Sequence, residues 1–118
     1  MPFRPADTPR GPADLDPRSD AELVRAARHG DRAAFDALYL RHREWVLALA
    51  LRHTARRDDA LDVAQDAFVQ LLKKLPELEL AGPPTTWLYP VVVHRAIDLA
   101  RKRVRDALDE AALAEAAA

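Results

Sequence analysis

The longest regular pattern of apolar and polar positions lies between Asp58 and Leu75. Apolar side chains recur there at spacings of three and four residues, which is typical of an amphipathic helix that packs one face on a core. The predicted inward stripe is Leu61, Ala64, Phe68, Leu71, Leu72 and Leu75. Asp58 or Asp59 is expected to cap the start of this helix, and Pro76 to end it.

Two helices are predicted before this one. Ser19 followed by Glu22 forms a capping box at the start of a short helix, which ends at Gly30 because glycine suits the left-handed position after a helix. Asp31 then caps a longer helix. Its apolar stripe is Phe35, Leu38, Tyr39, His42, Val46, Leu49 and His53.

A last helix is predicted after the prolyl pair at 83–84, with Thr85 or Thr86 as its cap. Its inward stripe is Leu88, Val91, Val92, Ala96, Leu99 and Ala100. Pro90 lies inside the helix, where it removes a backbone hydrogen bond and favours a bend. Together these patterns predict an all-α fold, a compact bundle of about four helices.

Composition divides the chain into three parts. Residues 1–18 are rich in proline and poor in large apolar residues, so they are expected to form a flexible tail. Residues 19–105 carry the helical patterns and form the predicted domain, since 118 residues suffice for one hydrophobic core. Residues 106–118 are rich in alanine and are expected to form a linker or an extension of the last helix.

The residue types present argue against several classes of function. No cysteine occurs, which excludes disulfides, thiolate metal sites and cysteine nucleophiles. The histidines and carboxylates match no metal-binding spacing, and no glycine-rich phosphate loop or serine elbow is present. We therefore expect no enzyme activity, no cofactor and no metal, with a divalent ion on the helix aspartates as a weaker alternative. Neither a signal peptide nor a membrane-spanning run is recognised, so a cytoplasmic location away from membranes is predicted.

Charge is segregated along the chain, although the formal net charge is only −1. Asp58, Asp62 and Asp66 form an acidic ridge with Gln65 beside it. Like charges four residues apart repel by a few tenths of a kcal/mol. The ridge therefore indicates either a basic partner or simply a face turned to solvent.

The last predicted helix is basic. Between Thr85 and Arg105 five bases stand against one aspartate, and Trp87 and Tyr89 lie near its start. Cations that follow a phosphate backbone and aromatic faces that stack on bases are what single-stranded nucleic acid requires. Aromatic residues at a helix start also occur in protein cores, and basic residues at a helix end suit its dipole. These residues alone leave both interpretations open.

Three stretches occur in order between Asp20 and Arg105: ELVRAARHGDRAAFDALYLRHREWV, DDALDVAQDAFVQLLKKL and TTWLYPVVVHRAIDLARKR. Together they resemble region 2 of bacterial sigma-70-type factors, and most of all the extracytoplasmic-function (group 4) class. The resemblance implies a helical, non-enzymatic transcription initiation domain. It also implies that the second stretch docks on the clamp helices of the RNA polymerase core β′ subunit. By position, the polymerase-binding residues would be Leu61, Asp62, Gln65, Asp66 and Leu72.

The resemblance further implies that the last helix recognises the promoter −10 element as single-stranded DNA, with a base flipped into a pocket built from residues 80–84. The DNA-binding residues would be Pro84, Thr85, Trp87, Tyr89, His94, Arg95, Asp98, Arg101, Lys102 and Arg103. An anti-sigma factor is an expected regulatory partner.

The last helix departs from the family pattern. Pro90 and Val93 stand where basic residues are usual, His94 stands in the place of an asparagine, and the preceding loop is shortened to Gly-Pro-Pro. Fewer phosphate contacts weaken DNA binding. The alternative prediction is therefore a degenerate sigma-like interaction module that binds polymerase or a regulatory partner without DNA. No region 4 for −35 recognition is expected after Arg105.

Overall fold

Four α-helices and one short 3-10 helix follow one another in the computed structural model, which describes residues 15–80 and 82–118. Their bounds are α1 (Asp20–Arg28), α2 (Arg32–Leu51), α3 (Arg57–Lys74), η2 (Leu75–Glu77) and α4 (Pro84–Ala117). The described residues contain no strand. The predicted all-α bundle is therefore confirmed. Most of the predicted tail lies outside the described residues.

The first two helices begin and end where their local residues predicted. The Ser19 hydroxyl accepts a hydrogen bond from the Glu22 backbone N–H at 3.2 Å. Gly30 adopts a φ of 92°, a left-handed conformation that only glycine enters without strain. The Asp31 carboxylate then accepts from the Ala34 N–H at 3.1 Å and caps α2.

The predicted caps of the other two helices were wrong. Arg56 is the N-cap of α3, and Asp59 instead forms an ion pair with α4. Pro83 is the N-cap of α4, which starts at Pro84 because a proline at the first helical position lacks an N–H that would need a partner. Thr85 therefore lies one residue inside the helix, fully buried.

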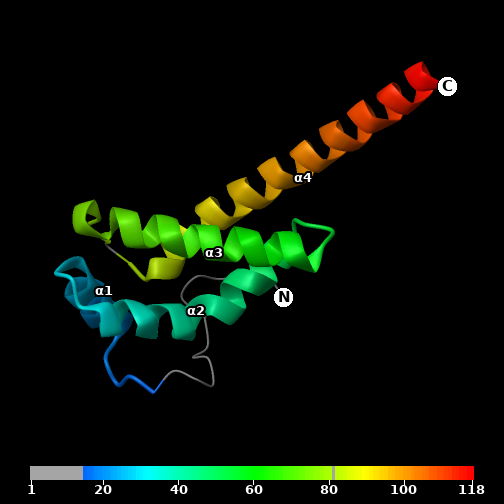
Figure 1. Cartoon of the computed structure of the whole chain (residues 1–118). Helices are drawn as coiled ribbons and strands as arrows, with labels where there is room; N and C mark the ends of the chain where they lie inside the picture. Colours follow the sequence, from blue (N-terminus) through cyan, green and yellow to red (C-terminus); the bar gives the residue numbers. More distant parts are fainter. Residues whose placement is uncertain (1–14, 81) are drawn as a thin grey trace.

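The core forms where α2 packs on α1, α3 and α4 (Figure 1). The inward row of α3 is Ala60, Val63, Ala67, Phe68, Leu71 and, just beyond its end, Leu75. The prediction that Leu61 and Leu72 face the core was wrong, since they are 44% and 40% exposed. The small side chains of Ala60 and Ala67 are fully buried in their place, so the inward face is centred on them and the two leucines fall at its edge.

A buried ionic cluster ties α1 to α2. The Asp20 carboxylate accepts from the Arg41 guanidinium at 3.0 Å and lies 3.0 Å from the Nε2 of His42. Burial opposes ionisation of Asp20, yet the bonds to His42 and Arg41 outweigh it, so its pKa lies below the ordinary value. This cluster fixes α1 against α2 at one end of the bundle.

The last helix is much longer than the bundle requires. It continues through Pro90, which is exposed, and extends away from the other helices to Ala117 (Figure 1). All residues from 101 to 117 are exposed. The predicted boundary between 105 and 106 falls inside this continuous helix, and the extent of the functional domain stays a prediction.

Candidate functional site

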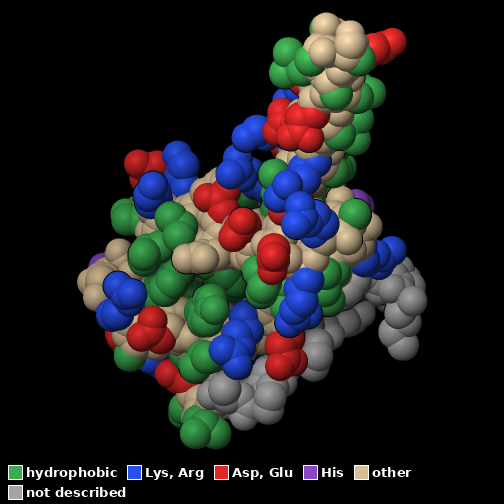
Figure 2. Space-filling model, turned by 45° about the vertical axis from the view of Figure 1, so that its right-hand side comes forward, with side chains coloured by type: hydrophobic (Ala, Val, Ile, Leu, Met, Phe, Trp, Pro, Cys, Tyr) green, Lys and Arg blue, Asp and Glu red, His purple; other side chains and the backbone are tan. Residues whose placement is uncertain are grey.

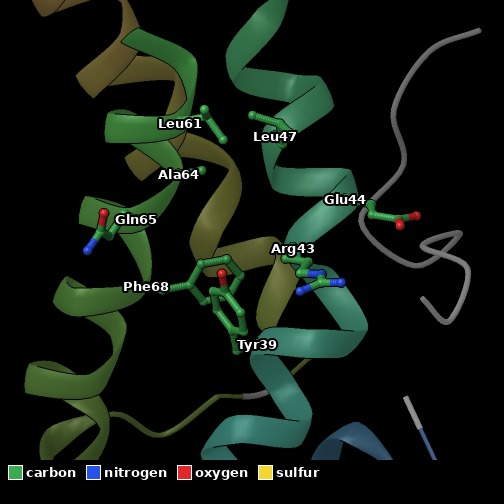
Figure 3. A pocket seen from close by; sticks show the side chains of 8 residues that line it. All are labelled: Tyr39, Arg43, Glu44, Leu47, Leu61, Ala64, Gln65 and Phe68. Atoms are coloured by element: carbon green, nitrogen blue, oxygen red, sulfur yellow. The ribbon is translucent and has the colours of Figure 1, made fainter. Parts of the chain in front are cut away.

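An apolar groove runs between α2 and α3, with a volume of about 610 Å³ (Figure 3). Its lining residues are Tyr39, Arg43, Glu44, Leu47, Leu61, Ala64, Gln65 and Phe68. At one end Leu47 and Leu61 approach each other across the groove. At the other, the rings of Tyr39 and Phe68 meet edge to face, with centroids 5.0 Å apart.

The same face continues along α3 as a smaller hollow of about 180 Å³ that reaches Leu72. Several large apolar side chains on this face are partly open to solvent: Tyr39 is 39%, Val69 41% and Leu72 40% exposed. Contiguous exposed apolar surface of this kind is typical of a binding site. The pattern of α3 alone did not reveal the groove, because half of its wall comes from α2.

A charged seam joins the opposite edge of α3 to α4. It consists of Asp59, Asp62 and Asp66 on α3 and Arg95, Lys102 and Arg103 on α4. Arg95 pairs with Asp66 at 2.5 Å, and the Nε of Arg103 donates to Asp59 at 2.7 Å. Between the helices lies a hollow of about 440 Å³. Figure 2 shows acidic and basic side chains intermingled on the visible face of the molecule.

The ion pair between Asp59 and Arg103 is the most enclosed part of the charged seam. Asp59 is only 4% exposed, while the Arg103 side chain stays half open. The hydrogen bonds from Arg103 lower the pKa of Asp59 against the opposing effect of burial, and the carboxylate in turn raises the pKa of Arg103. Both groups are therefore held in their charged forms.

These contacts change the interpretation of the acidic ridge. Its basic partner is in part the chain's own α4, since Asp66 is paired there. Asp58 and Asp62 remain exposed. The five predicted polymerase-binding residues straddle the outward face of α3. Leu61, Gln65 and Leu72 line its groove edge, whereas Asp62 and Asp66 lie on its seam edge.

The ten predicted DNA-binding residues do not form one surface. Pro84 and Thr85 are buried and Tyr89 lies beside Trp45 of α2, with ring centroids 6.4 Å apart. Arg95 and Arg103 are engaged with α3. The members spaced along one exposed side of α4 are Trp87, which is half-buried, and His94, Asp98, Arg101 and Lys102, which are exposed.

The loop before α4 encloses a further hollow of about 210 Å³. Leu80 and Gly82 line it on one side, and Arg25 and Arg28 of α1 on the other. The sequence predicted a base pocket at residues 80–84 but gave no sign that α1 contributes two cations. Residue 81 lies outside the described residues.

Residues 15–80 and 82–118 hold neither a membrane-spanning helix nor a metal-binding cluster. No helix there is long and apolar enough to cross a membrane. No group of three or more histidine, aspartate or glutamate side chains is placed to hold a metal ion within residues 15–80 and 82–118.

Comparison with known families decides the class of this fold. The family described as Sigma-70 region 2 matches residues 38–106. The chain belongs to this family. The predicted resemblance to a sigma-70-type region 2 is thus confirmed, and the family is one of non-enzymatic transcription factors.

Curated relatives place this sigma region 2 domain among extracytoplasmic-function factors. The RNA polymerase sigma-H factor of Pseudomonas aeruginosa is 33% identical over 82 residues, which are 70% of this chain and 42% of that protein. The ECF RNA polymerase sigma factor SigM of Mycobacterium tuberculosis is 35% identical over 85 residues, 72% of this chain and 43% of that protein. The chain therefore spans less than half the length of these relatives.

A solved structure shares the arrangement of helices. It is an engineered region 2 of sigmaE in complex with GTAAAA, which superposes with a TM-score of 0.68 at 29% identity. The match covers 75% of this chain and 93% of that one. The sigma region 2 fold of this chain is thus supported by both sequence and structure.

Proposed function

We propose that this sigma region 2 domain acts in transcription initiation by docking on the β′ clamp helices of RNA polymerase and holding the promoter −10 element as single-stranded DNA. The observation that carries the proposal is its similarity to a region 2 structure in complex with GTAAAA. Relatives named RNA polymerase sigma factors support the polymerase partner. An anti-sigma factor that covers the same surfaces is part of the proposal.

The polymerase contact is proposed on the outward face of α3. A partner that covers Leu61 in the apolar groove and Leu72 in the smaller hollow beside it gains stability, since burying apolar surface yields about 25 cal/mol per Å². Gln65 lies at the groove edge and can hydrogen-bond to a partner backbone. On the other edge, exposed Asp62 presents negative charge to the basic residues expected on the clamp helices, whereas Asp66 must first exchange its pair with Arg95.

The DNA contact is proposed along one side of α4 and the loop before it. Trp87 offers a partly exposed aromatic face for stacking, and Arg101 and Lys102 offer unenclosed cations for phosphates. The hollow between the loop and Arg25 and Arg28 is the proposed place for a base taken out of the stack.

The remaining members of the predicted DNA set have supporting positions in this proposal. Buried Pro84 and Thr85 fix where α4 begins, and Tyr89 anchors it on Trp45. Arg95 and Arg103 hold α4 on α3 through their ion pairs. The two arginines can contact a DNA strand only if their ion pairs with α3 open.

Fluorescence anisotropy with labelled oligonucleotides tests the DNA contact. A single strand that contains GTAAAA should bind more tightly than the same sequence in a duplex, and binding should weaken with salt. Arg101→Ala should reduce the slope of log K against log salt by roughly 0.7, the value for one phosphate contact on a single strand. Lys73→Ala is the matched control, because Lys73 is an exposed cation on α3 outside the proposed path.

The protein-only alternative predicts a different outcome in the same assay. A domain that binds polymerase core but shows no preference for the single strand, or a salt-independent signal, would refute the DNA half of the proposal. Polymerase binding is measured separately, so the two halves can fail independently.

A further inference from the structure

The end of α4 carries an apolar row that no other element within residues 15–80 and 82–118 covers. Val104, at the edge of the bundle, is 59% exposed, and Leu108, one turn further along, is 64% exposed. The row begins inside the bundle at Ile97 and Ala100, which with Val104 line an open hollow of about 470 Å³ beside His53. At about 100° per residue these positions share one side of the helix. Figure 2 shows hydrophobic side chains on the projecting part of the molecule.

Charges on the same segment are arranged in two opposite blocks. Bases come first, at Arg101, Lys102, Arg103 and Arg105. Acids follow, at Asp106, Asp109, Glu110 and Glu115. A second copy of this helix complements both blocks only when it runs antiparallel, since a parallel copy sets like charges side by side. The segment is therefore complementary to itself.

We propose that the projecting end of α4 is a docking surface for a second copy of this chain, in an antiparallel, two-fold arrangement. An axis at Ala107 sets Arg105 opposite Asp109 of the other copy, and the reverse pair forms at the same time. At 100° per residue, Arg105 and Asp109 lie about 60° and 100° from Leu108 on the same side of the helix, so the long Arg105 side chain can reach Asp109 of the other copy beside the apolar row.

The same register also joins the apolar rows. It places Leu108 near Leu108 of the second copy and Val104 near Ala111. Apolar contact along the row supplies the attraction, and the flanking charges select direction and register. Stable interfaces bury about 800 Å² on each partner, more than a short helix pair supplies. The dimer is therefore weak and reversible.

Sedimentation velocity of the 118-residue chain across a wide concentration range tests the surface. The mass should rise from the 13.2 kDa of the monomer toward twice that value as concentration increases. Leu108→Glu should raise the dissociation constant at least tenfold. Leu113→Glu is the matched control: Leu113 is 71% exposed on the same helix but points about 140° away from Leu108 at 100° per residue. Circular dichroism of both variants checks that the helix is retained.

A charge-swap pair separates this arrangement from non-specific apolar association. Arg105→Glu and Asp109→Arg should each weaken self-association at least tenfold, because each creates two like-charge contacts across the axis. Mixing the two variants should restore association, because every opposed pair is then of opposite sign. A chain that stays monomeric at all concentrations, equal effects of the two leucine variants, or a mixture no tighter than its components would each overturn the proposal.

Discussion

The two edges of α3 differ in how far the chain itself covers or pairs their side chains. On the α2 side, the apolar groove leaves Leu61, Tyr39 and Phe68 around an open hollow that nothing within the described residues fills. On the α4 side, the charged seam satisfies most of its charge within the chain, through Asp59 with Arg103 and Asp66 with Arg95. The groove is open to a partner, as proposed above, whereas most charges of the seam already have partners within the chain.

Because of this difference, the two edges of the outward face of α3 are expected to contribute differently to binding. A partner that covers the groove gains energy from apolar burial, while a partner at the seam must compete with existing ion pairs. We therefore expect affinity for polymerase to come mainly from the groove edge, and the charges of the seam edge to set orientation and association rate.

The largest expected effect is a loss of stability when the buried ring under the apolar groove is truncated. Phe68 is 4% exposed and packs against Tyr39, so Phe68→Ala should cost about 3–5 kcal/mol of unfolding free energy, the usual cost of such a truncation. Val69→Ala, one residue along on the exposed side, should cost less than about 0.5 kcal/mol. Urea denaturation followed by circular dichroism measures both. Equal losses would mean that the groove floor is not part of the core.

A smaller loss of stability is expected at the seam. Arg103→Ala leaves Asp59 enclosed without its cation, so the urea midpoint should fall. Lys102→Ala removes a neighbouring exposed base, and its midpoint should stay close to the parent value. If both variants unfold together with the parent, the seam contributes nothing to holding α4.

Low pH should remove the contribution of the charged seam to folding stability. The folded-state pKa of Asp59 is lowered by Arg103, so the stabilisation is present above the unfolded-state pKa of about 3.9 and is lost as pH falls through the lower folded-state value. The difference in midpoint between the parent and Arg103→Ala should therefore be constant near neutral pH and shrink below about pH 4. A difference that grows on acidification would contradict the pairing.

Polymerase docking is expected to distinguish positions along the outward face. Asp62→Lys and Gln65→Ala should weaken binding to RNA polymerase core, by about tenfold for the charge reversal, or ~1.4 kcal/mol. Asp58→Lys is the matched control, an exposed aspartate one turn earlier and outside the proposed contact. Pull-down affinity with unchanged circular dichroism is the measurement. Equal weakening by Asp58→Lys would indicate a long-range charge effect rather than a contact.

The smallest expected effect is a change in DNA affinity when the pair between Asp66 and Arg95 is removed. Asp66→Asn removes the partner of Arg95 and leaves its guanidinium available to phosphate, so binding to the single-stranded oligonucleotide should tighten by a few-fold with a steeper salt slope. The double variant Asp66→Asn with Arg95→Ala should lose this gain. Anisotropy titrations compare the variants, and a gain that survives in the double variant would show that Arg95 is not its source.

Local sequence signals predicted much of the fold. The caps at Ser19 and Asp31 and the left-handed Gly30 are decided by bonds between residues close in the chain, so their positions followed from the residue types. The same logic failed at the start of α3, because Asp59 has a stronger partner 44 residues away than any backbone N–H nearby. A pattern within one helix cannot show a partner on another.

The sequence by itself determined the helices, their order and the membership of the sigma region 2 family, since each depends on residue type and spacing. Only the tertiary structure decided which face of α3 meets which neighbour. By spacing alone, Leu61 fits a buried stripe. In the structure Ala60 and Ala67 occupy the centre of the buried face, so Leu61 lies at the edge of the apolar groove. The division of α3 into an open apolar edge and a paired charged edge arises from side chains contributed by α2 and α4, which come together only on folding.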